Sequence, residues 1–182
     1  VQIKMEKEEY AIILDYLPNG YPLERKMMPL AQAIGENLFS LLEIVPRKGV
    51  SLEVEEKVYI GEGKRDKVYY ILGRLQPEKV TEQAKNNLQE FLRKAVEGRE
   101  KEFVEFFNKS EAINKRIHKI ELVPGFGKKH MREILKEREI KPFESFEDMK
   151  KRIQNLPDPK KAVEKRIFQE LTEDERHLLF IK

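Results

Sequence analysis

The residues best suited to chemistry in this chain are a glycine-containing turn and the cations that follow it, Leu122-Val-Pro-Gly-Phe-Gly-Lys-Lys129. Gly125 and Gly127 allow a sharp turn and let the backbone approach a ligand closely. A helix expected to begin at Lys128 presents free N–H groups and a partial positive charge at its start. This combination predicts a phosphate-binding site.

The segment resembles the helix-hairpin-helix motif of nucleic-acid-binding proteins, in which an apolar residue and Pro-Gly-apolar-Gly join two packed helices. Val123, Gly125, Phe126, Gly127 and Met131 occupy the positions of that motif. The alternative is a plain turn between helices, because glycine-containing interhelical turns are common. The predicted nucleic-acid-binding residues are Lys119, Gly125, Phe126, Gly127, Lys128, Lys129 and Arg132.

The distribution of charge favours a polyanionic partner for this part of the chain. The 182 residues carry 36 basic and 33 acidic side chains, a net charge of +3. Residues 1–80 have 12 basic and 13 acidic side chains, whereas Lys109–Lys141 has 10 basic and 5 acidic, a local +5. If Lys128 and Lys129 are not the contacts, the alternative cations are Lys115, Arg116 and Lys119.

Short apolar runs that end at Pro, Asn or Gly predict strands in the first 78 residues. The runs are Ala11–Leu17, Pro29–Ile34, Phe39–Val45, Lys57–Ile60 and Asp66–Leu75. We expect the last two to pair as a hairpin across the Gly61-Glu-Gly-Lys-Arg turn. Five short strands predict a small closed or nearly closed barrel over residues 1–78, because an open sheet of this size leaves its edges unpaired.

Helical spacing of apolar residues begins after Pro77 and predicts an all-α domain over residues 79–182. Thr81 is expected to cap the first helix and Gly98 to end it. Ser110 is expected to cap a third helix that bears Ile113, Ile117 and Ile120 on one face. The helix-hairpin-helix is therefore placed at residues 111–139.

A second, degenerate copy of the unit is predicted at residues 145–171, displaced by 33 positions. Ile120, Val123 and Pro124 correspond to Ile153, Leu156 and Pro157, while Gly125-Phe-Gly127 becomes Asp158-Pro-Lys160. Asp158 repels phosphate and Pro159 has no N–H to donate, so we expect this second hairpin to be structural. The two copies predict a paired helix-hairpin-helix domain.

The whole chain also resembles an uncharacterised family of small archaeal proteins that join an oligonucleotide/oligosaccharide-binding-type (OB-type) β-barrel to a helix-hairpin-helix domain. The resemblance rests on these segments: Pro29–Gly35, Leu41–Pro46, Lys57–Gly61, Leu122–Met131 and Pro142–Asp148. It implies an α+β fold of a five-stranded OB-like barrel followed by the paired helix-hairpin-helix domain. It also implies RNA binding and no established activity, so RNA is the favoured partner, with DNA as the alternative.

An enzyme is the second class considered, and the sequence disfavours it. The chain has no Cys, no Walker loop, no Rossmann fingerprint and no serine elbow. His118 and His130 with Glu121 or Glu133 lack tight metal-ligand spacing, so solvated histidines on a basic face are expected instead. Glu144–Asp148 reads as a helix start with a Ser145 cap, which argues against a DNA repair glycosylase. We expect no catalytic residue, metal or cofactor.

The third class is a protein-interaction scaffold or a subunit of a nucleic-acid-processing complex. The barrel or the apolar end Leu178–Ile181 are the segments that would contact a protein partner. Tyr59, Tyr69, Tyr70, Arg65 and Lys67 are alternative base-stacking candidates on the barrel. The charged opening Val1–Tyr10 and the absence of ~18 consecutive apolar residues predict no signal peptide, no membrane span and a cytoplasmic location.

Overall fold

The computed structural model describes residues 7–25 and 27–182. Residues 1–6, which belong to the predicted β domain and to the charged opening Val1–Tyr10, lie outside the described residues. The fold is α+β, as predicted. The chain forms two compact units. Unit 1 contains residues up to Gln89 with Leu171–Glu173 and Ile181–Lys182, and unit 2 contains Glu90–Glu170 and Asp174–Phe180.

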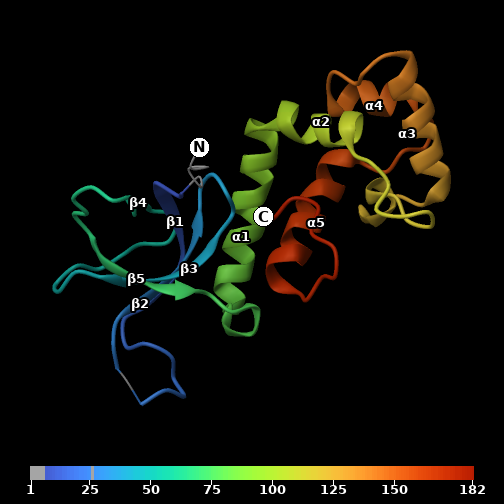
Figure 1. The fold of residues 1–182 in the computed structure, drawn as a ribbon. Coiled ribbons are helices and arrows are strands. Elements are labelled where there is room, and N and C mark those ends of the chain that lie inside the picture. Colours follow the sequence, from blue (N-terminus) through green and yellow to red (C-terminus); the bar gives the residue numbers. More distant parts are fainter. Residues whose placement is uncertain (1–6, 26) are drawn as a thin grey trace, which may run out of the picture. The chain divides into compact units, whose positions relative to one another are not determined.

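Unit 1 is built on a curled, five-stranded antiparallel sheet, a half-barrel (Figure 1). The strands are β1 (Tyr10–Leu17), β2 (Leu30–Gly35), β3 (Leu41–Pro46), β4 (Lys57–Tyr59) and β5 (Val68–Arg74). Their order across the sheet is β4-β1-β2-β3-β5. Register shifts in β1 at Ile13/Asp15 and between β3 and β5 at Glu43/Ile44 and Val45/Pro46 add twist and bend the sheet.

The predicted hairpin between Lys57–Ile60 and Asp66–Leu75 is wrong. β4 pairs with β1 through Tyr10↔Tyr59, and β5 pairs with β3. A side chain holds the loop between β4 and β5 in shape: the Arg65 guanidinium donates to the carbonyl oxygens of Ile60 and Gly61 at 2.9 and 2.8 Å. The two strands therefore extend opposite edges of the β1–β3 meander.

Strand β2 contributes alternate residues to the apolar core of the sheet, and Gln32 between them bonds to the segment just before helix α1 (Glu82–Gly98). Ala31 and Ala33 lie in the apolar cluster of the sheet. Gln32, fully buried, donates to the Lys79 carbonyl at 2.7 Å and accepts from the Thr81 N–H at 3.0 Å. A polar side chain in this core is tolerated because it is hydrogen-bonded, and it fixes the approach to α1.

Helix α1 begins and ends as the sequence predicts. The Thr81 hydroxyl accepts from the Ala84 N–H at 3.0 Å and donates to Asp15 at 2.6 Å, so one side chain caps the helix and ties it to β1. Gly98 is the last helical residue. The chain passes from unit 1 into unit 2 within this helix.

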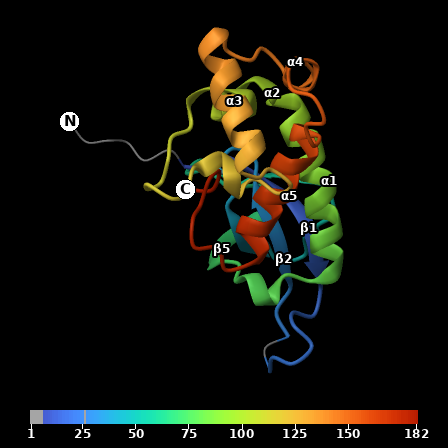
Figure 2. The same cartoon turned by 90° about the vertical axis from the view of Figure 1, so that its right-hand side faces the viewer.

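Unit 2 is helical (Figure 2). After α1 its elements are α2 (Glu100–Lys109), the 3-10 helix η2 (Lys119–Leu122), α3 (Lys128–Ile140), α4 (Phe146–Arg152) and α5 (Pro159–Thr172). The predicted Ser145 cap is confirmed, because its hydroxyl accepts from the Asp148 N–H at 2.9 Å. The predicted third α-helix from Ser110 to Ile120 is wrong, since residues 111–118 form no helix.

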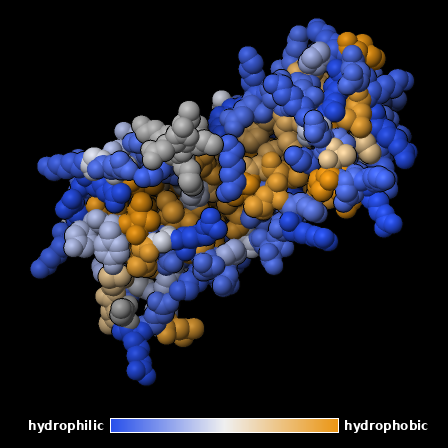
Figure 3. Space-filling view, viewed as in Figure 1, coloured by the Kyte–Doolittle hydropathy of each residue, from blue (hydrophilic) through white to orange (hydrophobic). Residues whose placement is uncertain are grey.

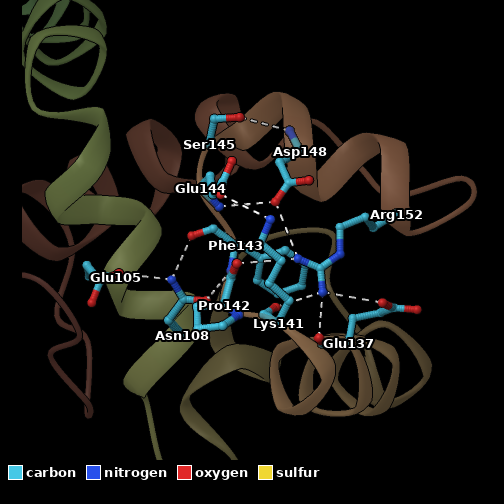
Figure 4. Close-up of polar contacts among 10 residues, drawn as sticks. All are labelled: Glu105, Asn108, Glu137, Lys141, Pro142, Phe143, Glu144, Ser145, Asp148 and Arg152. Atoms are coloured by element: carbon cyan, nitrogen blue, oxygen red, sulfur yellow. Dashed lines mark hydrogen bonds and ion pairs between the residues drawn. The ribbon is translucent and has the colours of Figure 1, made fainter.

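Arg152 holds the connection between α3 and α4 (Figure 4). Its guanidinium donates to the carbonyl oxygens of Glu137 and Lys141 at 2.5 and 2.7 Å, and it lies over the Phe143 ring at 4.4 Å. The same group pairs with Asp148, whose pKa is lowered mainly by the hydrogen bond from the Glu144 N–H and also by Arg152. One side chain thus satisfies carbonyl groups at the end of α3, which positions that helix.

On the face drawn in Figure 3, hydrophilic side chains surround patches of hydrophobic ones. No helix of the described residues is long and apolar enough to span a bilayer. In unit 1 the exposed large apolar side chains include Leu23, Met27, Tyr69 and Leu72.

Candidate nucleic-acid interface

The Pro124–Gly127 turn adopts a conformation that favours glycine at one of its two Gly positions. Gly125 has φ +84°, in the left-handed region that costs other residues free energy. The Phe126 N–H closes the turn on the Val123 carbonyl at 3.0 Å. Phe126 itself is buried, with its ring 5.6 Å from that of Phe107. Among the predicted binding residues, Phe126 therefore anchors the turn with its side chain and offers a ligand only its backbone.

Gly127 is the N-cap of α3, and its backbone does not require glycine. It has an extended conformation (φ −103°), and a Cβ placed there would meet no described atom within 4 Å. Ser or Asp would fit and would cap the helix. Instead, α3 starts with no side-chain cap and no acidic residue in its first turn. No side chain of the described residues therefore caps this helix start, and Gly127, Lys128 and Lys129 are exposed.

Four predicted cations surround this helix start. Lys119, Lys128, Lys129 and Arg132 are exposed, and none forms an ion pair within the described part of the chain. Two other cations of unit 2 pair with acidic residues close in sequence, Lys109 with Glu105 at 3.0 Å and Lys141, at the far end of α3, with Glu144 at 3.2 Å. Basic residues in a first helical turn oppose the helix dipole. The arrangement concentrates positive charge where it does not stabilise the fold.

A hydrogen-bonded turn replaces the helix that was expected before this site. Ala112 and His118 form an isolated β-bridge, and the Asn114 side-chain oxygen accepts from the N–H groups of Arg116 and Ile117 at 2.8 and 3.0 Å. Such side-chain bonds compete with helical ones, which accounts for the failed prediction. The sequence analysis missed Asn114, although Asn followed by polar residues is a turn signal.

His118 is buried and serves as a helix cap, so the predicted solvated histidine is wrong at this position. Its Nδ1 accepts from the Ile120 N–H at 3.1 Å, and the backbone N–H of His118 donates to the Glu121 carboxylate at 2.7 Å. Nδ1 must be unprotonated to accept. Burial, followed by the positive charge of Arg138, lowers the pKa of the imidazole below its usual 6.5.

We expect protonation of His118 to destabilise unit 2. Because the folded-state pKa lies below the unfolded value, its contribution to stability is complete above about pH 6.5 and is lost as pH falls through the folded pKa. His118→Asn keeps an acceptor at the cap but removes the titration. Urea unfolding between about pH 7 and pH 5 should therefore show a smaller loss of stability for the variant. Parallel pH profiles for the two proteins would contradict this role.

The other histidine near the turn, His130, packs against the Phe126 ring, and its Nε2 is buried without a hydrogen-bond partner among the described residues. The His130 ring stacks on Phe126 with centroids 6.1 Å apart. Across residues 7–25 and 27–182, no group of three or more His, Cys, Asp or Glu side chains is arranged to hold a metal ion.

The second hairpin differs from the first in backbone as well as in side chains. Its residue with positive φ is Asn155 (φ +59°), three positions before Asp158, which corresponds to Gly125 in the repeat. Asp158 accepts from the N–H groups of Lys160 and Lys161 at 3.0 and 3.5 Å. The start of α5 is therefore capped by a carboxylate, whereas the start of α3 is open.

The aromatic candidates of unit 1 are divided between structural contacts and exposure. The Tyr59 hydroxyl accepts from the Gly63 N–H at 2.9 Å, and Lys67 pairs with Glu56. Tyr69 is 64% exposed and lies edge-on to Tyr70 at 5.2 Å. These two tyrosines on β5 are therefore the rings of the predicted set that a partner can reach.

Comparison with known proteins finds relatives over nearly the full chain. The profile of a family described as "Protein of unknown function (DUF655)" matches residues 7–182. The uncharacterised protein MJ0038 of Methanocaldococcus jannaschii is 42% identical over 177 residues, 96% of this chain and 80% of that protein. The crystal structure of Af1531 from Archaeoglobus fulgidus, a DUF655 protein, superposes with a TM-score of 0.82 at 41% identity. That similarity covers 96% of this chain and 100% of Af1531.

Proposed function

We propose that the chain, which belongs to the DUF655 family of uncharacterised proteins with archaeal homologues, is a non-catalytic nucleic-acid-binding protein. The observation that carries the proposal is the open start of α3, where no side chain of the described residues caps the helix and unpaired cations gather. Helix starts of this kind bind phosphate groups. Backbone phosphates are therefore the proposed ligand.

Each residue of the turn has a distinct part in the proposal. Gly125 supplies the left-handed backbone, and Gly127 leaves the approach to the α3 N–H groups open. Lys128, Lys129 and Arg132 supply mobile charge, and Lys119 adds a cation from η2. Contacts of this kind position a protein on nucleic acid without reading its sequence.

We include two finer assignments in the proposal, an OB-like barrel in unit 1 and a paired helix-hairpin-helix domain in unit 2. The sheet order leaves β4 and β5 at opposite edges, so pairing of these two strands would complete a barrel. In unit 2, two turns each precede a helix, α3 and α5. The family resemblance on which these assignments depend also makes RNA the favoured partner over DNA.

The alternative is a protein-interaction scaffold, and one observation favours it. Tyr69 and Leu72 are exposed on β5, which pairs with β3 along one side and forms an edge of the sheet along the other. Exposed apolar side chains on a strand edge are suited to contact with another protein.

Salt-titrated binding to duplex and single-stranded RNA and DNA tests the proposal. We expect binding at low salt that weakens linearly on a log–log scale as salt is added, because bound phosphates release counterions. Failure to bind all four probes at low salt would refute the proposal and favour the scaffold.

Replacing Lys128 and Lys129 together with Ala should weaken binding to every probe by a similar factor. Each lost phosphate contact should reduce the salt slope by about one counterion. Stability should change by less than about 0.5 kcal/mol, since both side chains are exposed. Lys101 and Lys165, exposed cations of α2 and α5, give the control when both are replaced with Ala. Equal affinities for the two double variants would place the contact elsewhere.

A further inference from the structure

Residues 174–180, called the 174–180 segment below, follow α5 in unit 2 and contain no helix or strand. The chain after α5 folds back beside that helix in both Figure 1 and Figure 2. The segment contacts two helices of the same unit, α2 through Phe103 and Phe106 and α5 through Arg166 and Glu170. We call these four side chains the α2–α5 site.

The α2–α5 site binds the main chain of the segment through two charged side chains. The Glu170 carboxylate accepts from the consecutive N–H groups of Leu179 and Phe180 at 2.9 and 3.0 Å. The Arg166 guanidinium donates to the His177 carbonyl at 2.5 Å. The Glu170 side chain is 0% exposed and that of Arg166 is 7% exposed, so these charge-assisted bonds form away from water, where they are strong. Main-chain bonds of this kind give a peptide its affinity, and side-chain contacts give the selectivity.

Two side chains of the segment supply that selectivity. The Phe180 ring lies 4.7 Å from that of Phe106 and 5.8 Å from that of Phe103. The Glu175 carboxylate pairs with Arg166 Nη1 at 3.4 Å. The α2–α5 site therefore fits an irregular, non-helical peptide with an aromatic anchor and an acidic residue five positions before it.

The polar part of the site is formed without the segment. Arg166 and Glu170 lie one helical turn apart on α5, and their side chains pair with each other at 2.9 Å. Departure of the segment would therefore leave neither charge isolated, which is the costly outcome for a buried pair. A largely preformed set of polar groups beside apolar ones is the usual form of a ligand site.

The 174–180 segment has the features of a docked ligand as well as those of a part of the fold. Leu178 is 51% exposed, so the segment lies on the surface of unit 2. Helix α5 ends at Thr172, and the two residues that follow it, Glu173 and Asp174, are both exposed. Segments with few buried apolar contacts open at a lower free energy than the core does. Exchange of such an element between two copies of a chain is a low-cost route to a dimer.

We propose that the α2–α5 site is a peptide-binding site, that the 174–180 segment is its ligand within one chain, and that the same segment of a second copy can replace it. A second copy is the occupant that the structure favours, because it supplies the same Phe180 anchor and the same Glu175 charge that the site already holds. The proposal is independent of nucleic-acid binding and uses no residue of the Pro124–Gly127 turn.

Fluorescence anisotropy with a labelled peptide of residues 173–182 tests the proposal on the full chain. In the unchanged protein, its own segment competes with the peptide at an effective concentration of about millimolar. Phe180→Ala in the protein removes the anchor of that competitor, so this variant should bind the peptide at least about tenfold more tightly than the unchanged protein does. The matched control is the peptide with Phe180→Ala, which has the same length and charge and should bind the variant at least about tenfold more weakly.

Amide hydrogen exchange of the unchanged protein gives a second measurement that needs no variant. Unlabelled peptide at a concentration of about 5 mM, above the effective concentration of the segment, should accelerate exchange at Leu179 and Phe180, because their N–H groups lose Glu170 when the segment is displaced. The peptide with Phe180→Ala should leave this exchange unchanged.

Sedimentation velocity tests the second copy directly. The unchanged protein should form a dimer whose share grows as the chain approaches about 1 mM, where a second copy competes with the chain's own segment. Phe180→Ala should lower that share by at least about tenfold, because its segment has no anchor. A monomer at every concentration would overturn exchange between copies.

Three results would overturn the peptide site itself. Equal affinities of the unchanged protein and Phe180→Ala for the peptide would place binding outside the α2–α5 site. Failure of Phe180→Ala to bind the peptide, with fast exchange at Leu179 showing that its segment has left the site, would show that the site holds only a covalently attached segment. Unaltered exchange at Leu179 and Phe180 of the unchanged protein in excess peptide would show the same, and this last result decides even if circular dichroism finds Phe180→Ala unfolded.

Discussion

Replacing Glu170 with Ala should lower the free energy of unfolding by up to about 3–5 kcal/mol, the cost of breaking a buried ion pair, since Arg166 keeps only the more exposed Glu175, 3.4 Å from its Nη1. The Glu170 side chain is 0% exposed and that of Arg166 is 7% exposed, with 2.9 Å between the carboxylate and Arg166 Nε. Ion pairs on the surface are exposed to water and contribute about 1 kcal/mol or less to stability, so this buried pair should matter more.

The effect is large because Glu170 also holds the segment that follows α5. Its carboxylate accepts from the N–H groups of Leu179 and Phe180 at 2.9 and 3.0 Å, and Arg166 donates to the His177 carbonyl at 2.5 Å. Phe180 packs on Phe106 with ring centroids 4.7 Å apart. Loss of the carboxylate thus removes the acceptor of two backbone N–H groups and also the closer of the two carboxylate partners of the buried Arg166.

Urea unfolding followed by circular dichroism measures the loss, and amide hydrogen exchange locates it. Exchange at Leu179 and Phe180 should accelerate in Glu170→Ala. Glu170→Gln keeps a side-chain oxygen for those N–H groups and should lose less. Glu147→Ala, at an exposed pair with Lys150, should change stability by about 0.5 kcal/mol or less. A Glu170→Ala loss no larger than that of Glu147→Ala would show that the pair is not a stabilising contact.

Features set by neighbouring residues were predictable from the sequence. The Thr81 cap, the end of α1 at Gly98 and the Ser145 cap each depend on side chains within three or four residues of the backbone they bind. The α+β class and five strands follow from the same local spacing. The resemblance to archaeal proteins is confirmed by the family match and by MJ0038 and Af1531.

The strands with which β4 and β5 pair were not predictable, because β1 and β3 are distant from them in sequence. Adjacent strands usually pair, but here the Arg65 side chain closes the connection and each strand joins a different edge. The failed helix at 110–120 has a related cause. Ala112, Ile113, Ile117 and Ile120 follow a helical period, yet the bonds of Asn114 and His118 select a turn and a 3-10 helix.

The candidate site was predictable in its residue types but not in its electrostatics. The glycines and cations of the Pro124–Gly127 turn are visible in the sequence. The pairs of Lys109 with Glu105 and of Lys141 with Glu144 are local in sequence, whereas the absence of an ion pair at Lys119, Lys128, Lys129 and Arg132 among the described residues is known only from the structure. The burial of Phe126 in the turn also depends on the ring of Phe107, which lies in helix α2.

Gly125→Asp should remove most nucleic-acid binding, by at least about tenfold, while costing about 1 kcal/mol of stability. Gly125 has φ +84°, a conformation that Asp and Asn tolerate better than most residues. A Cβ there would lie 3.5 Å from Pro157, an ordinary contact, so the fold should persist. The carboxylate would then repel a phosphate that approaches the α3 N–H groups.

Gly125→Asn is the matched control, because it has the same shape and backbone preference without the charge. Of the two variants, we expect Gly125→Asp to be the more stable one and the weaker binder. Asp beside a helix start is stabilising by roughly 0.3–1 kcal/mol, so Gly125→Asp should be at least as stable as Gly125→Asn. It should nevertheless bind more weakly, and the difference should shrink as salt screens the carboxylate. Chemical denaturation and anisotropy on the same samples measure both quantities.

Asp158→Gly supplies the corresponding change in the second hairpin. Asp158 caps α5 and does not lie at the position of positive φ, so glycine there removes two side-chain hydrogen bonds without recreating the first turn. Gly is a fair N-cap, and the loss of stability should be about a few tenths of a kcal/mol. Affinity should stay the same or rise slightly as a carboxylate is lost. A loss of binding at Asp158→Gly equal to that at Gly125→Asp would mean that both hairpins contact the ligand, whereas a loss at Asp158→Gly alone would assign binding to the start of α5.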